Sequence, residues 1–534
     1  MTRALLRFQL RRERWVLPLW MLGILGLLAA SGAAVAREFG GEEERFALAA
    51  VAAGNPAFLF LRGLPDGSDV GALVFFQTFA FLAILTGLMN TFLVVRHTRA
   101  DEERGRAELI AATPVPRTLP LRVTLGIALG ANAVLAAGAS GLGLALGYEP
   151  RSAVVMGLAI GSIGVCFAGV AALVAQIMPS PRGANGVAAA VVGAAYLVRG
   201  IGDALGTATD LTHVTPSWIS MFSPIGWAQA SAPFSAANPL PLLAVVGLGA
   251  VTAGAAIAIR GRRDLGESVI PERVGRPTWP RASAGRLAVR TQRGTTIGWA
   301  VGTGILGLFA GTLSPLVAEA VASNDDLAEL IGRLSPGLDV DTGQVFTVAL
   351  LGLAGTLAAA AGVQAMIRMR GDEAEGRAEL FLATPLRRTG WLARQLGAGL
   401  ASMVIVAAVG GLAAGTSLAI AGGEAGRIPE SLGAIAVFLP AGAVFVTLTA
   451  LAFSVLPRAT IALGWGMLAL GLVLGQFGDL IGLPEWLQDV SPFRHVPAVP
   501  MEAVEPWALV LPGLAAAAFA GAAFVLLRRR DIPA

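Results

Sequence analysis

Lysine is absent from this 534-residue chain, so all 39 basic side chains are arginines. A P-loop needs a lysine against the β- and γ-phosphates of a nucleotide, and that motif is therefore excluded. Cys166, the single cysteine, lies within an apolar run, which excludes an internal disulfide and a cysteine metal site and favours a buried packing role. The three histidines, His97, His213 and His495, are scattered over predicted loops, so no zinc or nucleophile constellation is expected.

Charge of either sign is also scarce. Charged residues make up 14% of the chain and hydrophobic residues 55%, with a mean hydropathy of +0.70, whereas about a quarter of the residues of an ordinary soluble domain are charged. The formal charge of +4 is spread along the chain rather than gathered in one patch, so nucleic-acid binding is not expected. The composition predicts an all-α integral membrane protein.

Twelve apolar runs approach or exceed the roughly 20 residues that a helix needs to cross the hydrocarbon core. They cover residues 15–36, 71–95, 123–148, 153–177, 183–201, 239–259, 296–317, 345–367, 396–422, 431–456, 459–478 and 507–527. Arg199, near one end of the fifth run, is the single Asp, Glu, His or Arg inside them, and we expect its guanidinium to extend to the interface. The first run resembles a signal peptide, but the matching run 296–317 lies in mid-chain, so both are expected to be retained spans.

The arginines indicate the topology. Threading the spans from a cytoplasmic N-terminus places 31 arginines on the inner side and 8 elsewhere. Because inner loops carry the excess of basic residues, both termini are predicted to be cytoplasmic.

An internal repeat is the most informative feature of the sequence. Residues 101–117 read DEERGRAELIAATPVPR and residues 372–388 read DEAEGRAELFLATPLRR, aligned without a gap at an offset of 271. Eleven of the 17 positions are identical, where this composition would give about two by chance. Two homologous halves of six spans each are predicted, and because six is an even number the halves run parallel.

The repeat sets the domain boundaries. We predict a first half at 1–260, a cytoplasmic linker at 261–285 and a second half at 286–534. Arginines at helical spacing open each half and predict interfacial helices at 1–14 and 286–295.

The repeated loop should contain a short cytoplasmic helix. Acidic residues would begin it, Glu102 and Arg106 would form an i, i+4 ion pair that recurs in the second copy, and the Thr-Pro pair would end it. The apolar tips, Leu109 and Leu380, would then lie opposite the charges. Such a loop can serve merely as a capped connection, but its retention in two copies favours a docking surface for a second protein.

These features resemble the permease subunits of type-2 ABC exporters. The resemblance rests on the two halves, the arginine-rich interfacial helix and the G-R-A-E-L-x-x-A-T-P loop, and the fused twelve-span form is similar to actinobacterial tetronasin-resistance and multidrug export permeases. It implies coupling loops at 96–122 and 368–395, docked onto two copies of a soluble ABC ATPase on the cytoplasmic side of a bacterial plasma membrane. ATP and Mg²⁺ would be bound by that partner, while this chain would have no catalytic residue, cofactor or metal of its own.

The residues that the resemblance implicates in coupling lie at matching positions of the two loops. They are Asp101, Glu102, Arg106, Glu108, Leu109, Thr113 and Pro114, with Asp372, Glu373, Arg377, Glu379, Leu380, Thr384 and Pro385. Lesser contacts are implied for residues 179–185 and 457–460. External gate helices are implied around Trp218, Trp227 and Trp486.

A substrate path is predicted along the axis that relates the parallel halves. In related permeases its walls come from spans 2, 5, 8 and 11 of such a chain. The candidate lining residues are Phe75, Phe79, Asn90, Tyr196, Phe346, Gln364, Trp465 and Phe477. Apolar aromatic walls with a few amides favour a lipophilic or amphiphilic cargo, such as a drug, an antibiotic or a lipid, that is moved out of the cell.

Two other functions remain possible at this stage. A secondary transporter can share twelve spans and parallel halves, but ion coupling normally needs titratable groups within the membrane, and the predicted spans offer Arg199 alone. An enzyme acting on lipid-linked substrates would need clustered carboxylates at a membrane face, and the acidic residues at 42–44 and 325–326 are typical of solvated charge runs.

Overall fold

The computed structural model describes residues 2–38, 41–54, 56–210, 212–271, 284–322, 342–422, 424–476 and 484–530. The chain divides into two compact units, residues 1–275 and 276–534. The division falls within the segment predicted to be a linker.

The first unit is a bundle of membrane-length helices with short helices at its two ends. Its helices are α1 (Thr2–Glu13), α2 (Val16–Glu38), α3 (Glu42–Gly54), α4 (Pro56–Arg62), α5 (Val70–His97), α6 (Arg99–Glu103), α7 (Arg106–Ala111), α8 (Leu119–Ala145), α9 (Pro150–Ile177), α10 (Pro181–Ala204), the 3-10 helix η1 (Trp218–Phe222), α11 (Pro224–Gln229) and α12 (Leu240–Arg262). Two short antiparallel strands, β1 (Thr207–Ala208) and β2 (Val214–Thr215), follow α10.

The second unit repeats the arrangement. Its helices are α13 (Ala284–Ala322), α15 (Thr342–Ala374), α16 (Arg377–Leu382), α17 (Arg388–Gly422), α18 (Arg427–Ala436), α19 (Phe438–Val455), the 3-10 helix η2 (Pro457–Ala459), α20 (Thr460–Gln476), α22 (Glu485–Gln488), the 3-10 helix η3 (Pro492–His495) and α23 (Pro506–Arg529). Residues 286–295, predicted to be an interfacial helix, form the first part of the continuous helix α13, whereas α1 is separated from α2 by a turn.

The prediction of twelve spans is confirmed: twelve helices in the described ranges are long and apolar enough to cross a membrane. Helices suit this environment because every backbone polar group in hydrocarbon must be bonded within the segment. Helices α9 and α10 each begin with a capping side chain followed by proline. At α9 the side chain of Glu149 accepts a hydrogen bond from the backbone N–H of Ser152, and at α10 that of Ser180 accepts one from Gly183.

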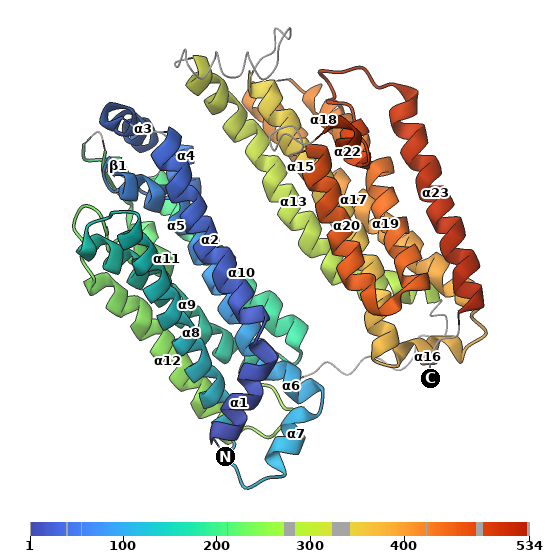
Figure 1. The fold of residues 1–534 in the computed structure, drawn as a ribbon, viewed down its shortest axis with the longest axis horizontal. Coiled ribbons are helices and arrows are strands. Elements are labelled where there is room, and N and C mark those ends of the chain that lie inside the picture. Colours follow the sequence, from blue (N-terminus) through green and yellow to red (C-terminus); the bar gives the residue numbers. More distant parts are fainter. Residues whose placement is uncertain are drawn as a thin grey trace. The chain divides into compact units, whose positions relative to one another are not determined.

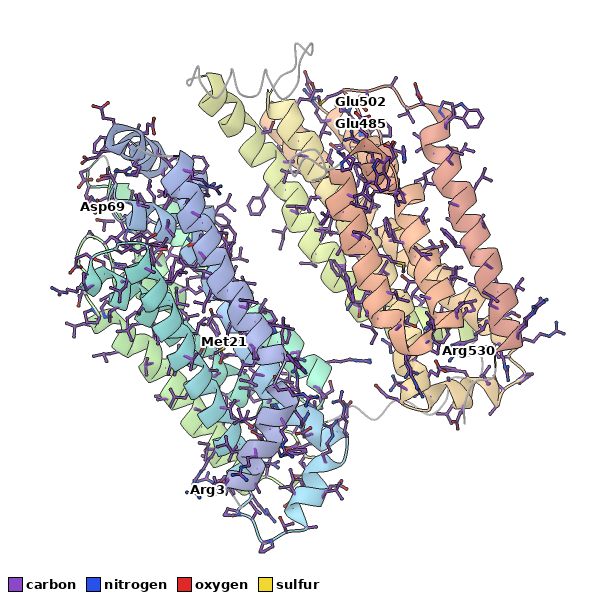
Figure 2. All side chains as sticks on the ribbon, in the orientation of Figure 1. Arg3, Met21, Asp69, Glu485, Glu502 and Arg530 are labelled. Carbon is purple, nitrogen blue, oxygen red and sulfur yellow. The ribbon has the colours of Figure 1, made fainter. Side chains whose placement is uncertain are left out.

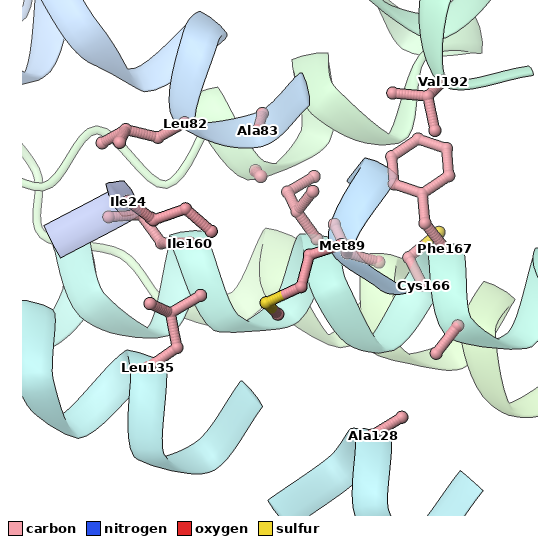
Figure 3. Close-up of a cluster of buried hydrophobic side chains, with 14 of the residues drawn as sticks. Ile24, Leu82, Ala83, Met89, Ala128, Leu135, Ile160, Cys166, Phe167 and Val192 are labelled. Atoms are coloured by element: carbon pink, nitrogen blue, oxygen red, sulfur yellow. The ribbon is translucent and has the colours of Figure 1, made fainter. Parts of the chain in front are cut away.

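The core of the first unit lies around its second and fourth spans, α5 and α9. Met89 of α5 belongs to a buried hydrophobic cluster that also contains Leu135, Ile160, Cys166 and Phe167 (Figure 3). Cys166 is fully buried, as expected for a packing residue.

Close packing between α9 and α12 depends on glycine. A Cβ atom at Gly169 would lie 2.2 Å from the carbonyl oxygen of Gly249, so the two backbones touch where larger residues would separate them. The small-residue packing predicted from the glycine content is therefore realised at this contact.

Each unit has one end that carries the repeated loop. In the first unit, α6 and α7 lie beside α1, and α3, α4 and β1 lie at the opposite end (Figure 1). In the second unit, α16 lies at the end where α23 finishes, and α22 lies at the other (Figure 1). Figure 2 places Arg3 and Arg530 at the loop-bearing ends of their respective units and Asp69 and Glu485 at the opposite ends.

Arg199 does not extend to the interface as predicted. Its side chain is fully buried and forms an ion pair with Asp203, Nη1 to Oδ2 at 3.2 Å. The prediction was wrong because α10 continues to Ala204, so Asp203 lies one helical turn beyond Arg199 on the same helix.

Candidate docking and coupling site

The repeated loop folds in the same way in both units. Gly105 and Gly376 take positive φ angles of 69° and 72°, in the left-handed region that favours glycine. Each glycine separates the acidic turn before it from a six-residue helix after it, α7 or α16. Both short helices end before the Thr-Pro pair, as predicted, and the hydroxyls of Thr113 and Thr384 each donate to the carbonyl three residues earlier at 2.6 Å.

The ion pairs of the loop differ from the predicted ones. The structure pairs Arg106 with Asp101, Nη1 to Oδ1 at 3.2 Å, and not with Glu102. In the second unit Arg377 Nη2 lies 2.8 Å from Asp372 Oδ1, and Glu373 is again not its partner.

The physical reason is the glycine turn. An i, i+4 pair requires continuous helical geometry, and the left-handed residue interrupts the helix between the acid and the arginine. The acidic residues also do not begin the short helix: Asp372 lies in the last turn of α15, and Asp101 lies in α6 directly after α5.

Glu102 and Glu373 instead bind the last membrane helix of their own unit. Glu102 Oε1 lies 2.6 Å from Arg263 Nη2, and Arg263 is the C-cap residue of α12. Glu373 is paired with Arg530, the C-cap residue of α23. Because the same contact recurs, each loop is tied to the helix that closes its half.

The same arginines reach a third helix. Arg263 Nε donates to Gln176 Oε1 at 3.0 Å near the end of α9, and Arg530 Nη1 donates to the carbonyl of Phe453 at 2.8 Å near the end of α19. Side-chain contacts therefore join each loop, which follows the second span of its unit, to the ends of the fourth and sixth spans.

Helix α1 adds a further anchor in the first unit. Arg12 Nη1 donates to Asp101 Oδ2 at 2.7 Å, while Glu13 accepts from Arg96 at 3.0 Å and lies 2.8 Å from His97 Nε2. Burial raises the pKa of Glu13, but the hydrogen bond from His97 and the charge of Arg96 outweigh it, so its pKa lies below the usual value. Glu13 is thus held as a carboxylate inside the junction.

The tips of the short helices are exposed. Leu109 is 74% exposed and Leu380 is 73% exposed, each preceded by an exposed glutamate, Glu108 or Glu379. A highly exposed leucine at the equivalent position of both units offers an apolar contact for another molecule.

The predicted path residues of the first unit lie inside its packing. Phe75 and Phe79 are buried and stacked, with ring centroids 4.5 Å apart. Asn90 is fully buried and exchanges two hydrogen bonds with Asn132, at 2.8 and 3.0 Å. Tyr196 donates to the carbonyl of Leu61 at 2.9 Å.

In the second unit, Gln364 accepts a hydrogen bond from Trp299 Nε1, and Trp465 is 37% exposed on α20. Phe346 belongs to α15, but its side chain lies outside the described residues, as does Phe477 altogether. The path therefore remains a prediction.

Short helices occur where the external gate was expected. Trp218 begins η1, Trp227 lies in α11 and Trp486 in α22. Trp218 and Trp486 are 72% and 70% exposed. Helices α3 and α4 were not predicted. Helix α4, with seven residues, is too short to show a periodic pattern.

A buried polar network that sequence reasoning missed holds the first of these regions. Asp203 accepts from Gln229 Nε2 at 2.9 Å and from Ser220 Oγ at 2.7 Å, while Arg199 Nη2 donates to the carbonyl of Phe60 at 2.9 Å. The network ties α4, η1 and α11 to the end of α10. The sequence contained one signal for this network: Arg199 and Asp203, of opposite charge, stand four positions apart near the end of a span.

The second unit keeps part of this arrangement. Ser223 Oγ donates to the carbonyl of Ala195, and Ser491 Oγ donates to the carbonyl of Gly471, both at 2.6 Å. Both serines stand in the Ser-Pro pairs that the two halves share.

Comparison with known proteins agrees with this architecture. Residues 282–528 match the family described as "Multidrug efflux system permease Rv1217c, C-terminal domain". The chain is also 34% identical, over 503 residues, to the multidrug efflux system permease protein Rv1217c of Mycobacterium tuberculosis (strain ATCC 25618 / H37Rv), a match that covers 93% of this chain and 89% of that protein. Identity at this level over nearly the full length of both chains shows that this protein belongs to the family of multidrug efflux system permeases.

Proposed function

We propose that this chain is the membrane subunit of an ATP-driven exporter of the type-2 ABC kind, and that α7 and α16 each dock one copy of a soluble ATPase. The observation that carries the proposal is the duplicated tip, where an exposed glutamate and leucine follow a glycine turn in both units. A partner with two equivalent copies would meet two equivalent surfaces.

The ion pairs explain how docking would drive transport. Movement of α7 acts on Asp101 through Arg106, and the adjoining Glu102 acts on α12 through Arg263. The equivalent pairs in the second unit end on Arg530. The pairs of Glu102 with Arg263 and of Glu373 with Arg530 have little exposure, so separating them would leave a charge unpaired in the protein interior. The side chains of Arg106 and Arg377 are about a third exposed, so their pairs are weaker links.

The energy source must come from the partner in this proposal. The absence of lysine removes the P-loop from the chain, so ATP and Mg²⁺ would be bound by the ATPase subunits. We expect the purified chain neither to bind nor to hydrolyse ATP and to support hydrolysis only when the ATPase is added.

The proposed cargo and the proposed topology rest on the predicted path residues and on the distribution of arginines. A lipophilic or amphiphilic compound suits a path with aromatic walls and few charges. The distribution of arginines supports cytoplasmic termini in a bacterial plasma membrane. Buried charges within the spans do not favour a secondary transporter, since Arg199 and Asp203 neutralise each other inside a structural network.

Under this proposal a neighbouring gene should encode a soluble ATPase with a P-loop, and docking is tested by co-purification with that protein. Leu109→Asp and Leu380→Asp should each weaken retention of the ATPase at least about tenfold, and the double variant should abolish it, while the protein stays inserted and monodisperse. Val269→Asp is the matched control, because Val269 is 58% exposed on the same side but lies outside both short helices. Normal retention and transport by the double variant would refute the docking assignment.

A further inference from the structure

Helix α1 carries a stripe of exposed arginines that takes no part in the ion pairs of the loops. Arg3, Arg7 and Arg11 follow one another at intervals of four residues, and Arg14 lies in the turn between α1 and α2. At about 100° per residue, the three within the helix lie inside an arc of about 80°. All four residues are exposed, and none has an ion-pair or hydrogen-bond partner among the described residues.

The opposite face of α1 holds the helix against its own unit. Gln9 is buried and accepts a hydrogen bond from Thr124 of α8 at 3.2 Å. Glu13, also buried, binds Arg96 and His97. Glu13 is the single acidic residue of α1, so the arginine stripe has no carboxylate on its own helix to balance it.

Exposed apolar side chains flank the stripe. Leu6 and Leu10 lie on one side of it and Phe8 on the other, and Trp15 follows Arg14 in the turn. The first membrane span begins with the next residue, so the stripe ends beside the segment that enters the hydrocarbon. Basic residues flanked by apolar ones are typical of a helix that binds at the level of the lipid headgroups, and tryptophan favours the same level.

The second half does not repeat the whole stripe. Gln292 of α13 is buried and bonded to the third span of its unit, as Gln9 is in the first. With these two glutamines matched, Gly294 and Ile297 stand where the first half has the last two arginines of the stripe. The row of four arginines is therefore a property of the first half.

The chemistry of the stripe selects an anionic lipid. A guanidinium group pairs with phosphate through two parallel N–H donors. The headgroup of phosphatidylglycerol has a net negative charge, whereas choline balances the phosphate of phosphatidylcholine. Clustered arginines on an amphipathic helix are attracted to such anionic headgroups. An acidic protein surface would also attract arginines, but the apolar flanks and the adjoining span favour a lipid.

From the unpaired arginines, their apolar flanks and the adjoining span, we infer that α1 binds anionic phospholipid, with lipid phosphates at the stripe and acyl chains against the flanking side chains. Arg12 of the same helix donates to Asp101 at 2.7 Å. The bound lipid therefore contacts the helix that anchors the loop of the first unit. The inference does not depend on docking of an ATPase.

The test measures lipid binding to the purified full-length chain in an uncharged detergent, without the ATPase. The probe is phosphatidylglycerol with a fluorescent acyl chain, and phosphatidylcholine with the same chain is the comparator. Saturable binding of phosphatidylglycerol is expected, at an affinity at least about tenfold above that of phosphatidylcholine. The preference should shrink between about 0.1 and 0.5 M salt, because salt screens exposed charges.

Variants then locate the site. Replacing all four arginines of the stripe by glutamine should remove the preference, whereas replacing all four by lysine, which keeps the charge, should retain most of it. Arg7→Gln with Arg11→Gln is the milder variant, and thermal unfolding shows that each protein is folded. The control removes the same charge from four exposed arginines at the loop-bearing ends of the units and should keep the preference; it combines Arg104→Gln, Arg262→Gln, Arg528→Gln and Arg529→Gln.

Four results would overturn the inference. They are the absence of saturable binding, equal affinity for the two lipids, an unchanged preference in the folded four-glutamine variant, and an equal loss in the control, which would mean that net charge and not the stripe attracts the lipid. If the four-glutamine variant keeps its lipid preference but loses the ATPase, the stripe binds protein and not lipid. Failure of the docking proposal is distinct, because it is decided by co-purification of the leucine variants.

Discussion

Arg263, the C-cap residue of α12, lies 2.6 Å from Glu102 in the loop after the second span. The two residues are 161 positions apart in the chain, and Arg530 and Glu373 repeat their contact in the second half. Conservation of a long-range ion pair between two internal copies makes it a property of the repeated design. It connects the surface proposed to meet the ATPase with the helices that cross the membrane.

Glu102→Gln and Glu373→Gln should uncouple hydrolysis from transport. The change keeps the size of the side chain but removes the charge that holds Arg263 or Arg530, so the loop loses its link to the closing helix. We expect transport per ATP hydrolysed to fall at least several-fold while basal hydrolysis by the assembled complex persists. Glu103→Gln, one residue along and outside these pairs, is the control, and an unchanged transport ratio in both variants would show that the pairs are only structural.

Gly105→Ala and Gly376→Ala test the turn before each docking helix. A Cβ atom would meet no heavy atom within 4 Å at either position, so the cost comes from the positive φ alone, about 1–2 kcal/mol. Reorientation of the short helix should weaken ATPase retention, and Asn, which tolerates this conformation better, should retain more of it. Gly371→Ala is the matched control, because Gly371 lies in α15 without a positive φ and also has open space around it. Equal retention by all of these variants would mean that the turn does not orient the helix.

The ion pair between Arg199 and Asp203 should be costly to break from one side. Both side chains are fully buried, so Arg199→Met leaves Asp203 unpaired and is expected to destabilise the first unit by roughly 3–5 kcal/mol. Arg199→Met combined with Asp203→Leu should recover much of the loss, measured as thermal unfolding in detergent. Asp210→Asn, at an exposed site nearby in the chain, should have little effect. A single variant as stable as the parent would contradict the buried network.

Stability should depend on the charge of Glu13. Its pKa is lowered in the folded protein, so its contribution is fully present above the ordinary glutamate pKa of about 4.3 and is lost as the pH falls through the lower, folded value. Glu13→Gln should therefore reduce the Tm at pH 7, and the difference from the parent should shrink as the pH falls below about 4. A difference that stays constant from pH 7 to pH 3 would show that the carboxylate charge contributes nothing.

The spans could be predicted from sequence because hydrophobic length is read directly from the chain, and the repeated loops could be located because the duplication singled them out; their docking role stays a prediction. The ion-pair partners within the loop could not be predicted from the sequence. The pairing of Arg106 depends on the left-handed turn at Gly105, and a helical rule applied across that turn selects Glu102 in place of Asp101. The Arg199 pair was missed for a related reason, since the apolar run ends before the helix does.

The last prediction concerns the substrate path, which was placed along α5 on the strength of Phe75 and Phe79. Both rings are almost completely buried, and Phe75 also contacts Phe234 at a centroid distance of 6.3 Å. Replacing either by alanine removes a large core side chain, which typically costs 3–5 kcal/mol, so a loss of transport alone does not distinguish packing from recognition.

The distinction requires two measurements on each variant: the Tm of the purified chain, and the concentration of drug that half-maximally stimulates hydrolysis by the assembled complex. A lining role for Phe75 or Phe79 predicts that this concentration rises, and rises differently for different drugs, whereas a packing role predicts a lower Tm with an unchanged drug dependence in the protein that remains folded. Phe76→Ala, at the adjoining buried position on α5, is the control for packing. Because Phe75 and Phe79 are stacked on each other, we expect the double variant to lose less stability than the sum of the single variants. If drug dependence is the same in Phe75→Ala, Phe79→Ala and Phe346→Ala as in the parent, the path does not run along these residues.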